Sequence, residues 1–322
     1  MSGHQGRLAR RTLLSTVLAA PALAQAPWPQ RSISLMVPYP PGGSTDNTAR
    51  PVSQKLSEVL GQNVVIENRG GAGGSIGAAM VAQARPDGYS FLCFPTAVLT
   101  ISPHMMRLPY DVQRDLTPVA MLSVSDGVMA MHPSVPLADI HALIAYAKAN
   151  PGKLRFSSAG NGTITQLIPE IFAANAGIRL EHVPYRGSAP ALTGVMGGEV
   201  ELQFDPVAIP AVKDGRLRGL ATLGEERSGQ LPDLPTLKEL GLYEGGAYSW
   251  FGLAAPAGLP PEITAKMVEA LRVVLADPAV ARAMAPVGLR PRLEHGAAFA
   301  RRVEQDRATF GEAVRRTGAK AE

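Results

Sequence analysis

Two short turns rich in small residues have the composition best suited to binding an anion. The first, Pro-Tyr-Pro-Pro-Gly-Gly-Ser-Thr-Asp at 38–46, follows an apolar run and precedes a helical pattern. The second, Ser-Ser-Ala-Gly-Asn-Gly-Thr at 157–163, has the same order of strand, turn and hydroxyl-rich helix start. Backbone N–H groups at the start of a helix lack partners within the helix and readily bind anions. Neither turn contains Lys or Arg, so backbone dipoles and hydroxyl groups would hold the anion.

Each turn by itself is better explained as the simple start of a helix. Two such turns, one in each half of the chain, could instead face each other across a cleft and bind a molecule with two acidic ends. For the pair, we therefore expect ligand binding.

Three further features leave alternatives open. The glycine loop at 70–77 follows a predicted strand, but its GxGxxxG spacing differs from GxGxxG, and no strand-end acid stands about 20 residues on, so a dinucleotide site is disfavoured. Close backbone approach to a cleft or to a neighbouring strand explains the glycines better.

Asp205 follows a predicted strand and either orients a ligand amine or hydroxyl or caps the next helix. Arg186, in another strand-to-helix turn, is either a carboxylate partner or an exposed residue at a cleft rim.

The sequence contains no pattern typical of a catalytic or metal site. It has no Gly-x-Ser-x-Gly elbow, and its histidines are scattered, with none four residues from another histidine or from cysteine. Cys93, the only cysteine, lies in an apolar run and is interpreted as a buried small hydrophobe rather than a reactive thiol. We expect no catalytic residue, no metal and no cofactor.

The first 24 residues have the composition of an export signal. A start with three arginines precedes an apolar run at 12–24, which ends in the small-x-small sequence Ala-Leu-Ala. The run is shorter than the roughly 20 residues that span a bilayer. Arg10-Arg11 fits a twin-arginine signal or a Sec signal with two chance arginines. Removing 1–24 changes the formal net charge from +4 to +1 and leaves no basic, aromatic-rich run for nucleic acid.

The remaining chain alternates short apolar runs with helical patterns, which is typical of α/β units on mostly parallel sheets. Pro51 is expected in the first turn of a helix that starts near Asp46 or Asn47. Pro169 is expected to kink its helix or to delay its start. The apolar stretch at 121–131 is expected to cross between two domains. Other strands are predicted at 32–37, 63–67, 89–94, 155–158, 180–183, 200–204, 217–223 and 248–254.

Together these segments resemble the solute receptors of the tripartite tricarboxylate transporter system, the Bug family. The resemblance extends from about residue 30 to about residue 320 and depends on the order and spacing of short motifs. These motifs lie at 38–46, 67–77, 86–89, 157–163, 182–187, 197–200, 204–205 and 249–258.

The resemblance implies a periplasmic binding protein type II-like α/β fold, with two lobes, a hinge and a ligand cleft between them. It implies a signal peptide at 1–24, lobe 1 at 27–127 and 249–322, and lobe 2 at 128–248. Ligand contacts in lobe 1 are expected at Tyr39, Gly42, Gly43, Ser44, Asp46, Ala72, Gly73 and Thr96. Ligand contacts in lobe 2 are expected at Ser157, Ser158, Gly160, Asn161, Gly162, Thr163, Tyr185, Arg186, Gly187 and Asp205.

Three residues depart from the family pattern. Gln166 stands where a histidine is usual, Pro169 lies in the helix that follows, and Pro51 interrupts the first helix. These departures leave the pose of the second-lobe helix open, and Gln166 could alter which ligands fit.

The function implied is that of an exported, monomeric, non-enzymatic receptor. It would capture a small organic carboxylate and deliver it to the membrane permease subunits of a tripartite transporter, with no role for nucleic acid. One alternative is a carboxylate receptor that signals to a membrane sensor. Another is a Rossmann-type oxidoreductase, which the missing acidic residue and the export signal both disfavour.

Overall fold

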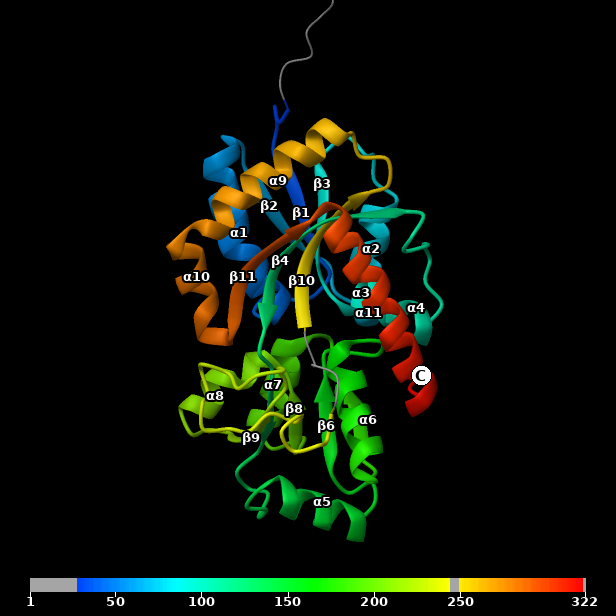
Figure 1. Ribbon diagram of the computed structural model, residues 1–322, viewed down its shortest axis with the longest axis vertical. Helices are drawn as coiled ribbons and strands as arrows, with labels where there is room; N and C mark the ends of the chain where they lie inside the picture. Colours follow the sequence, from blue (N-terminus) through cyan, green and yellow to red (C-terminus); the bar gives the residue numbers. More distant parts are fainter. Residues whose placement is uncertain (1–27, 244–248, 321–322) are drawn as a thin grey trace, which may run out of the picture.

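The computed structural model describes residues 28–243 and 249–320 of the 322-residue chain. The predicted signal peptide at 1–24 lies outside the described residues. The described chain forms two α/β lobes, each built around its own β-sheet, and Figure 1 shows one lobe above the other along the long axis. The two lobes confirm the predicted fold class.

The sheet of lobe 1 has six strands in the order β11-β4-β10-β3-β1-β2. β1 pairs in parallel with β2 and β3, whereas β10 is antiparallel to β3 and β4, and β11 is antiparallel to β4. The strands are β1 (Ile33–Val37), β2 (Val64–Asn68), β3 (Ser90–Pro95), β4 (Leu116–Ser125), β10 (Ser249–Pro256) and β11 (Leu289–His295).

Helices cover both faces of this sheet, so successive strand residues enter different apolar cores. Leu35 of β1 packs into a core with α1, α9 and α10, while its neighbour Met36 packs into a core with α2, α3 and α11. The helical segments of this lobe are α1 (Ser44–Leu60), η1 (Ala72–Gly74), α2 (Ser75–Ala82), α3 (Ala97–Thr100), α4 (Ser102–Met105), α9 (Pro261–Ala276), α10 (Pro278–Met284), η3 (Ala285–Val287) and α11 (Gly296–Thr317).

The sheet of lobe 2 has five strands in the order β7-β6-β8-β5-β9. β6 is parallel to β7 and β8, and β5 is antiparallel to β8 and β9. Its strands are β5 (Val128–Met131), β6 (Arg155–Ser158), β7 (Glu181–Pro184), β8 (Leu202–Phe204) and β9 (Arg218–Thr222). Its helical segments are α5 (Ile140–Ala149), α6 (Ile164–Ala176), α7 (Ser188–Met196), η2 (Pro206–Ala208) and α8 (Ile209–Lys213).

The chain passes from lobe 1 to lobe 2 between β4 and β5. β4 ends at Ser125 and β5 begins at Val128, so the stretch at 121–131 does cross between the sheets, as predicted. Helix α11 also connects the lobes, because Phe310 and Val314 near its end belong to the apolar core of lobe 2. The lobe boundaries at 127/128 and 248/249 stay a prediction. None of the described helices has the length and apolar composition needed to cross a bilayer.

Pro51 lies deeper in its helix than expected, because α1 starts at Ser44 and Pro51 falls beyond its first turn. Pro169 lies inside α6, which starts at Ile164, so this proline does not delay the helix start, and the expected kink stays a prediction. A proline at such a position removes one backbone hydrogen bond and costs about 3 kcal/mol. Burial of one face of each helix offsets this cost, with Val52 and Leu56 of α1 both at most 1% exposed.

Candidate functional site

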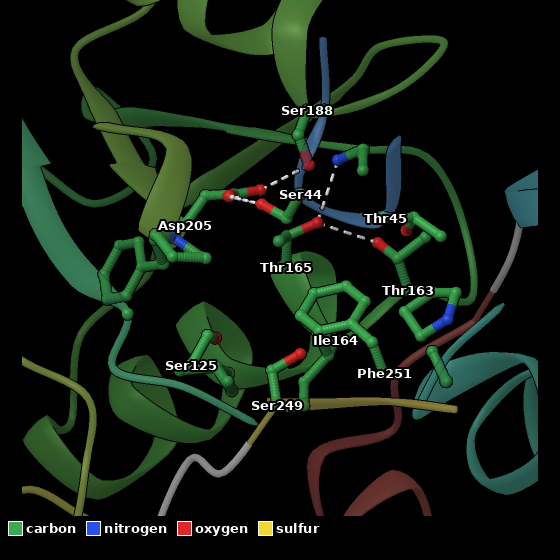
Figure 2. A pocket seen from close by; sticks show the side chains of 18 of the residues that line it. Ser44, Thr45, Ser125, Thr163, Ile164, Thr165, Ser188, Asp205, Ser249 and Phe251 are labelled. Atoms are coloured by element: carbon green, nitrogen blue, oxygen red, sulfur yellow. Dashed lines mark hydrogen bonds between the residues drawn. The ribbon is translucent and has the colours of Figure 1, made fainter. Parts of the chain in front are cut away.

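A cavity of about 50 Å³ lies between the two lobes. Figure 2 shows the side chains that line it, with hydroxyl groups gathered on its upper side and apolar side chains beside them. Its wall combines both predicted turns with strand ends of both sheets. It consists of Tyr39, Gly43, Ser44, Thr45, Pro95, Ala97, Ser125, Gly127, Ala159, Thr163, Ile164, Thr165, Ile168, Ser188, Phe204, Asp205, Pro206, Leu223, Ser249 and Phe251.

Lobe 1 contributes the N-terminus of α1. Gly43 is the N-cap residue, and no side chain caps this helix end, so the first amide groups of α1 are not used by a cap. The turn is held from behind by Asp46, which accepts hydrogen bonds from the Gly42 amide at 2.9 Å and from Asn68 Nδ2 at 3.0 Å. Asp46 also pairs with Arg50 at 2.6 Å. The buried carboxylate therefore supports the turn and does not line the cavity.

Lobe 2 contributes the N-terminus of α6. Thr163 is the N-cap residue, but its hydroxyl donates to the Gly160 carbonyl at 2.6 Å instead of capping the helix. Thr165 Oγ1 accepts a hydrogen bond from the Ala159 amide at 2.8 Å and lies 2.9 Å from Thr163 Oγ1. These bonds, of which Figure 2 draws the two made by Thr165, fix the threonine hydroxyls around a helix end whose first amides remain available.

The two lobes touch around the cavity. Ser44 Oγ of lobe 1 donates to Asp205 Oδ1 of lobe 2 at 3.1 Å, and Ser102 Oγ donates to the Gly162 carbonyl at 3.1 Å. At Gly73, a Cβ atom would lie 2.2 Å from the Asn161 carbonyl oxygen of the opposite lobe. The backbones approach too closely there for any side chain, so the structure represents a closed arrangement of the lobes.

Asp205 is the buried carboxyl group of the cavity wall. It accepts hydrogen bonds from Ser44 Oγ, from Ser188 Oγ at 2.5 Å and from the Val207 amide at 3.0 Å. Burial raises the pKa of Asp205, while these three donors oppose the shift. The residue caps η2, which is one of the two roles left open by the sequence, and it also lines the cavity, while its role in orienting a ligand group stays a prediction.

The cavity wall contains no cationic side chain among the described residues. Asp205 and Tyr39 are its ionisable groups, and Tyr39 donates its hydroxyl proton to the Gly73 carbonyl at 2.6 Å. Burial raises the pKa of Tyr39, so this side chain remains neutral. Within the described ranges, no three His, Cys, Asp or Glu side chains could hold a metal ion together. Positive potential in the cavity therefore comes from the helix N-termini, each equivalent to roughly half an elementary charge.

Comparison with known proteins relates this chain to a family. Residues 48–318 match the model of the tripartite tricarboxylate transporter family receptor. The chain is 38% identical to protein BugT of Bordetella pertussis over 278 residues, which cover 85% of each chain.

The chain belongs to this receptor family.

Two solved structures share its architecture. The periplasmic binding protein BugD is 30% identical, with a TM-score of 0.86 over 92% of this chain and all of BugD. A protein of R. palustris, solved with adipate, is 31% identical, with a TM-score of 0.85 over 91% of this chain and 99% of its own. The receptor thus has the two-lobed fold of periplasmic binding proteins.

Five of the residues expected to contact ligand line the cavity of the receptor. They are Tyr39, Gly43, Ser44, Thr163 and Asp205. Others hold the lining turns in place from behind: Thr96 bonds the backbone of Trp250, Ser157 donates to the Leu202 carbonyl, and Ser158 lies 2.6 Å from His182. The expected residues that lie outside the cavity wall are Gly42, Asp46, Ala72, Gly73, Thr96, Ser157, Ser158, Gly160, Asn161, Gly162, Tyr185, Arg186 and Gly187.

Several cavity residues were not expected from the sequence. Thr45 lies between the expected residues Ser44 and Asp46, and Thr165 follows two residues after Thr163, so the turns themselves could have indicated them. Ser125 and Ser249 lie at the end of β4 and at the start of β10, and they are register partners in the sheet. Ser249 begins a motif that carried the family resemblance, but only the pairing of the strands brings Ser125 beside it.

Gln166 lies away from the cavity and links the second turn to the end of the chain. Its Oε1 accepts from the Gly162 amide at 2.8 Å, and its Nε2 donates to Glu170 at 2.9 Å and to the Lys320 carbonyl at 3.0 Å. Gln166 is 2% exposed. It can therefore influence the ligand only through the position of the turn.

Stability of the receptor is expected to fall as the pH drops from about 6.5 to about 4, because His182 is held neutral. Its ring stacks on Phe156, and burial lowers its pKa from 6.5 to about 4. The unfolded chain binds a proton in this window and the folded chain does not, so acid favours unfolding. Urea unfolding across this pH range should show the loss.

The variant His182→Gln is the control for this pH dependence. It should flatten the pH profile, because glutamine does not titrate. The raised pKa of Asp205 acts in the opposite sense, since the folded state binds this proton more readily than the unfolded chain as the pH falls. An unchanged profile in His182→Gln would contradict the assignment to His182.

Proposed function

We propose that this receptor is exported, captures a small organic carboxylate between its two lobes and delivers it to the membrane permease subunits of a tripartite transporter. The observation that carries the proposal is the meeting of two helix N-termini, one from each lobe, at one cavity without a cationic side chain. The related protein solved with adipate supports a carboxylate as the ligand class. The predicted export signal at 1–24 supports a location outside the cytoplasm.

Capture follows from the geometry of the two turns. A ligand carboxylate first binds the free amides of one helix start, either Gly43–Thr45 or Thr163–Thr165. Closure then brings the other helix start onto the same ligand and adds its amides to those already bound. Because a ligand shifts a conformational equilibrium only by its difference in affinity between states, contact with both lobes is what favours closure.

The absence of cations from the described cavity wall suits release as well as capture. Charge-assisted bonds to Lys or Arg are roughly twice as strong as neutral ones. Amide and hydroxyl donors bind a carboxylate more weakly one by one, and most of them separate when the lobes open. Opening at the permease would therefore remove most of the contacts at once.

A thermal-shift screen of the mature protein tests the proposed ligand class. Each small carboxylic acid is paired with its own primary amide, which has a similar shape but no charge. A saturating acid should raise the melting temperature, since ligand at a hundred times its dissociation constant adds about 2.7 kcal/mol. The amide should not raise it. Stabilisation by amides or uncharged sugars, but by no acid, would contradict the proposal.

A further inference from the structure

Ser125 carries a buried hydroxyl group that has no partner. It is fully buried at the end of β4, and among the described residues its Oγ makes no hydrogen bond. Tyr110, Glu170 and Gln203 also have an unpartnered buried atom, but none of these three lines the cavity. Ser125 does, and an unsatisfied buried hydroxyl typically costs about 1–3 kcal/mol.

Ser123, two residues earlier in β4, shows that a buried serine hydroxyl in this strand can have a hydrogen-bond partner. Ser123 is equally buried, and its Oγ lies 3.0 Å from Thr48 Oγ1. Ser123 and Ser125 lie on the same face of β4, where Thr48 of α1 covers Ser123, whereas Ser125 lies further along the strand at the cavity. The missing partner of Ser125 is therefore specific to the cavity and indicates a group that arrives from outside the protein.

A second serine hydroxyl lies beside Ser125. Ser249 begins β10, is the register partner of Ser125 and also lines the cavity. Figure 2 shows the two serines across the cavity from Asp205, Ser44 and Thr163, with the hydroxyl oxygen of Ser249 directed into it. The cavity thus has two polar ends, the helix N-termini at one and this serine pair at the other.

The two ends of the cavity differ in their ability to compensate a negative charge on the ligand. The helix N-termini compensate one carboxylate at the first end. Among the described residues, no cationic side chain lines the serine end, and α3, which starts at Ala97 beside β10, is only four residues long. The cavity wall also already contains the carboxyl group of Asp205. A second ligand carboxylate beside Ser125 would lose its hydrating water and gain only two hydroxyl donors. Burying a charge with so few partners has an unfavourable free energy. A neutral hydroxyl or carbonyl group needs no charge compensation and can pair with both serines.

The size of the cavity limits the length of the ligand. A cavity needs a volume of roughly 10–15 Å³ to hold one buried water molecule. The cavity volume of about 50 Å³ therefore accommodates only a few groups of that size. Phe251 and Ile164 provide apolar surface for the short segment between the two polar ends.

We propose that Ser125 and Ser249 form a hinge subsite, which binds a neutral hydroxyl or carbonyl group at the far end of a short monocarboxylate. The inference rests on the proposed carboxylate function and specifies its substrate class as short hydroxy or oxo acids. The proposed ligand class differs from the ligand of the relative solved with adipate, because adipate has a second carboxylate.

Calorimetric titration of the mature protein with matched acids tests the subsite. The acids are straight-chain monocarboxylates and dicarboxylates of several short chain lengths. At each length, three acids are compared: one ends in a methyl group, one in a hydroxymethyl group and one in a second carboxylate. At the length that fits, the hydroxy acid should bind about ten-fold more tightly than the other two. In Ser125→Ala this preference over the methyl-ended acid should disappear, while the stability of the unliganded protein stays unchanged or rises.

Ser123→Ala is the matched control on the same strand. It removes a paired hydroxyl, so it should lower the melting temperature of the free protein and leave the order of the three acids unchanged. Equal binding of the three acids, tighter binding of the dicarboxylate, or a preference that survives in Ser125→Ala would overturn the hinge subsite. In each of these cases carboxylate binding persists, whereas a protein that binds none of the acids would contradict the carboxylate function itself.

Discussion

Replacing Gly73 with alanine is expected to weaken carboxylate binding about a hundred-fold while both lobes remain folded. The new Cβ atom would lie 2.2 Å from the Asn161 carbonyl oxygen, a distance that no relaxed contact allows. Asn161 belongs to the opposite lobe, so opening the lobes relieves the clash without unfolding either one. If opening leaves one molecule in a hundred closed, the apparent dissociation constant rises by the same factor. Calorimetric titration with a stabilising acid measures this change.

Gly61→Ala is the matched control for Gly73→Ala. Gly61 has φ 65°, close to the 61° of Gly73, but nothing lies within 4 Å of its added Cβ atom. Both variants carry the backbone strain of a left-handed alanine, about 1–2 kcal/mol. Only Gly73→Ala should lose affinity, and small-angle X-ray scattering with saturating acid should show it more open. Equal affinities in the two variants would contradict the role assigned to the contact between the lobes.

Replacing Trp250 with alanine is expected to lower the free energy of unfolding by about 3–5 kcal/mol. Trp250 is fully buried in β10, and its ring packs edge-to-face on Phe94 and Phe299. Its Nε1 donates to Asp306 Oδ2 at 2.6 Å. The substitution creates a cavity in the core between β10 and α11 and leaves Asp306 without this donor. Urea unfolding followed by circular dichroism measures the loss.

Trp250→Phe separates these two contributions. Phenylalanine keeps most of the ring packing but cannot donate to Asp306, so the expected loss is about 1–3 kcal/mol. Carboxylate affinity should remain in both variants wherever the protein is folded, because Trp250 does not line the cavity. A loss in Trp250→Phe as large as in Trp250→Ala would assign the stability to the hydrogen bond instead of the ring.

Most strands and long helices were predictable because their signals are local. Apolar runs reflect the burial of one face or both, and they located β1 and β3 to within a few residues. Strand β11 was missed. Its sequence, Leu-Arg-Pro-Arg-Leu-Glu-His, is mostly polar, because it lies at the edge of the sheet with β4 as its one neighbour. Its pairing with a strand more than 160 residues earlier leaves no local signal.

Helix α1 was predicted to start two or three residues later than Ser44, and the expected position of its proline in the first turn was wrong. Propensity alone puts Pro51 in the first turn, whereas packing of α1 against α9 and α10 keeps the helix intact on both sides of it. Asp46 illustrates the same limit within the site. The family resemblance placed it among the ligand contacts, yet it binds Gly42, Asn68 and Arg50 behind the turn.

The sequence by itself determined the two turns of small residues that precede helices, the lack of cations within them and membership of the receptor family. Glycines, hydroxyl residues and helix starts act through the backbone conformation of a few neighbouring residues, so their chemistry is visible in a short segment. Only the tertiary structure decided which side chains form the cavity. Ser125 and Ser249 meet through strand register, and Gly73 meets Asn161 through lobe closure, and both contacts join segments far apart in the chain.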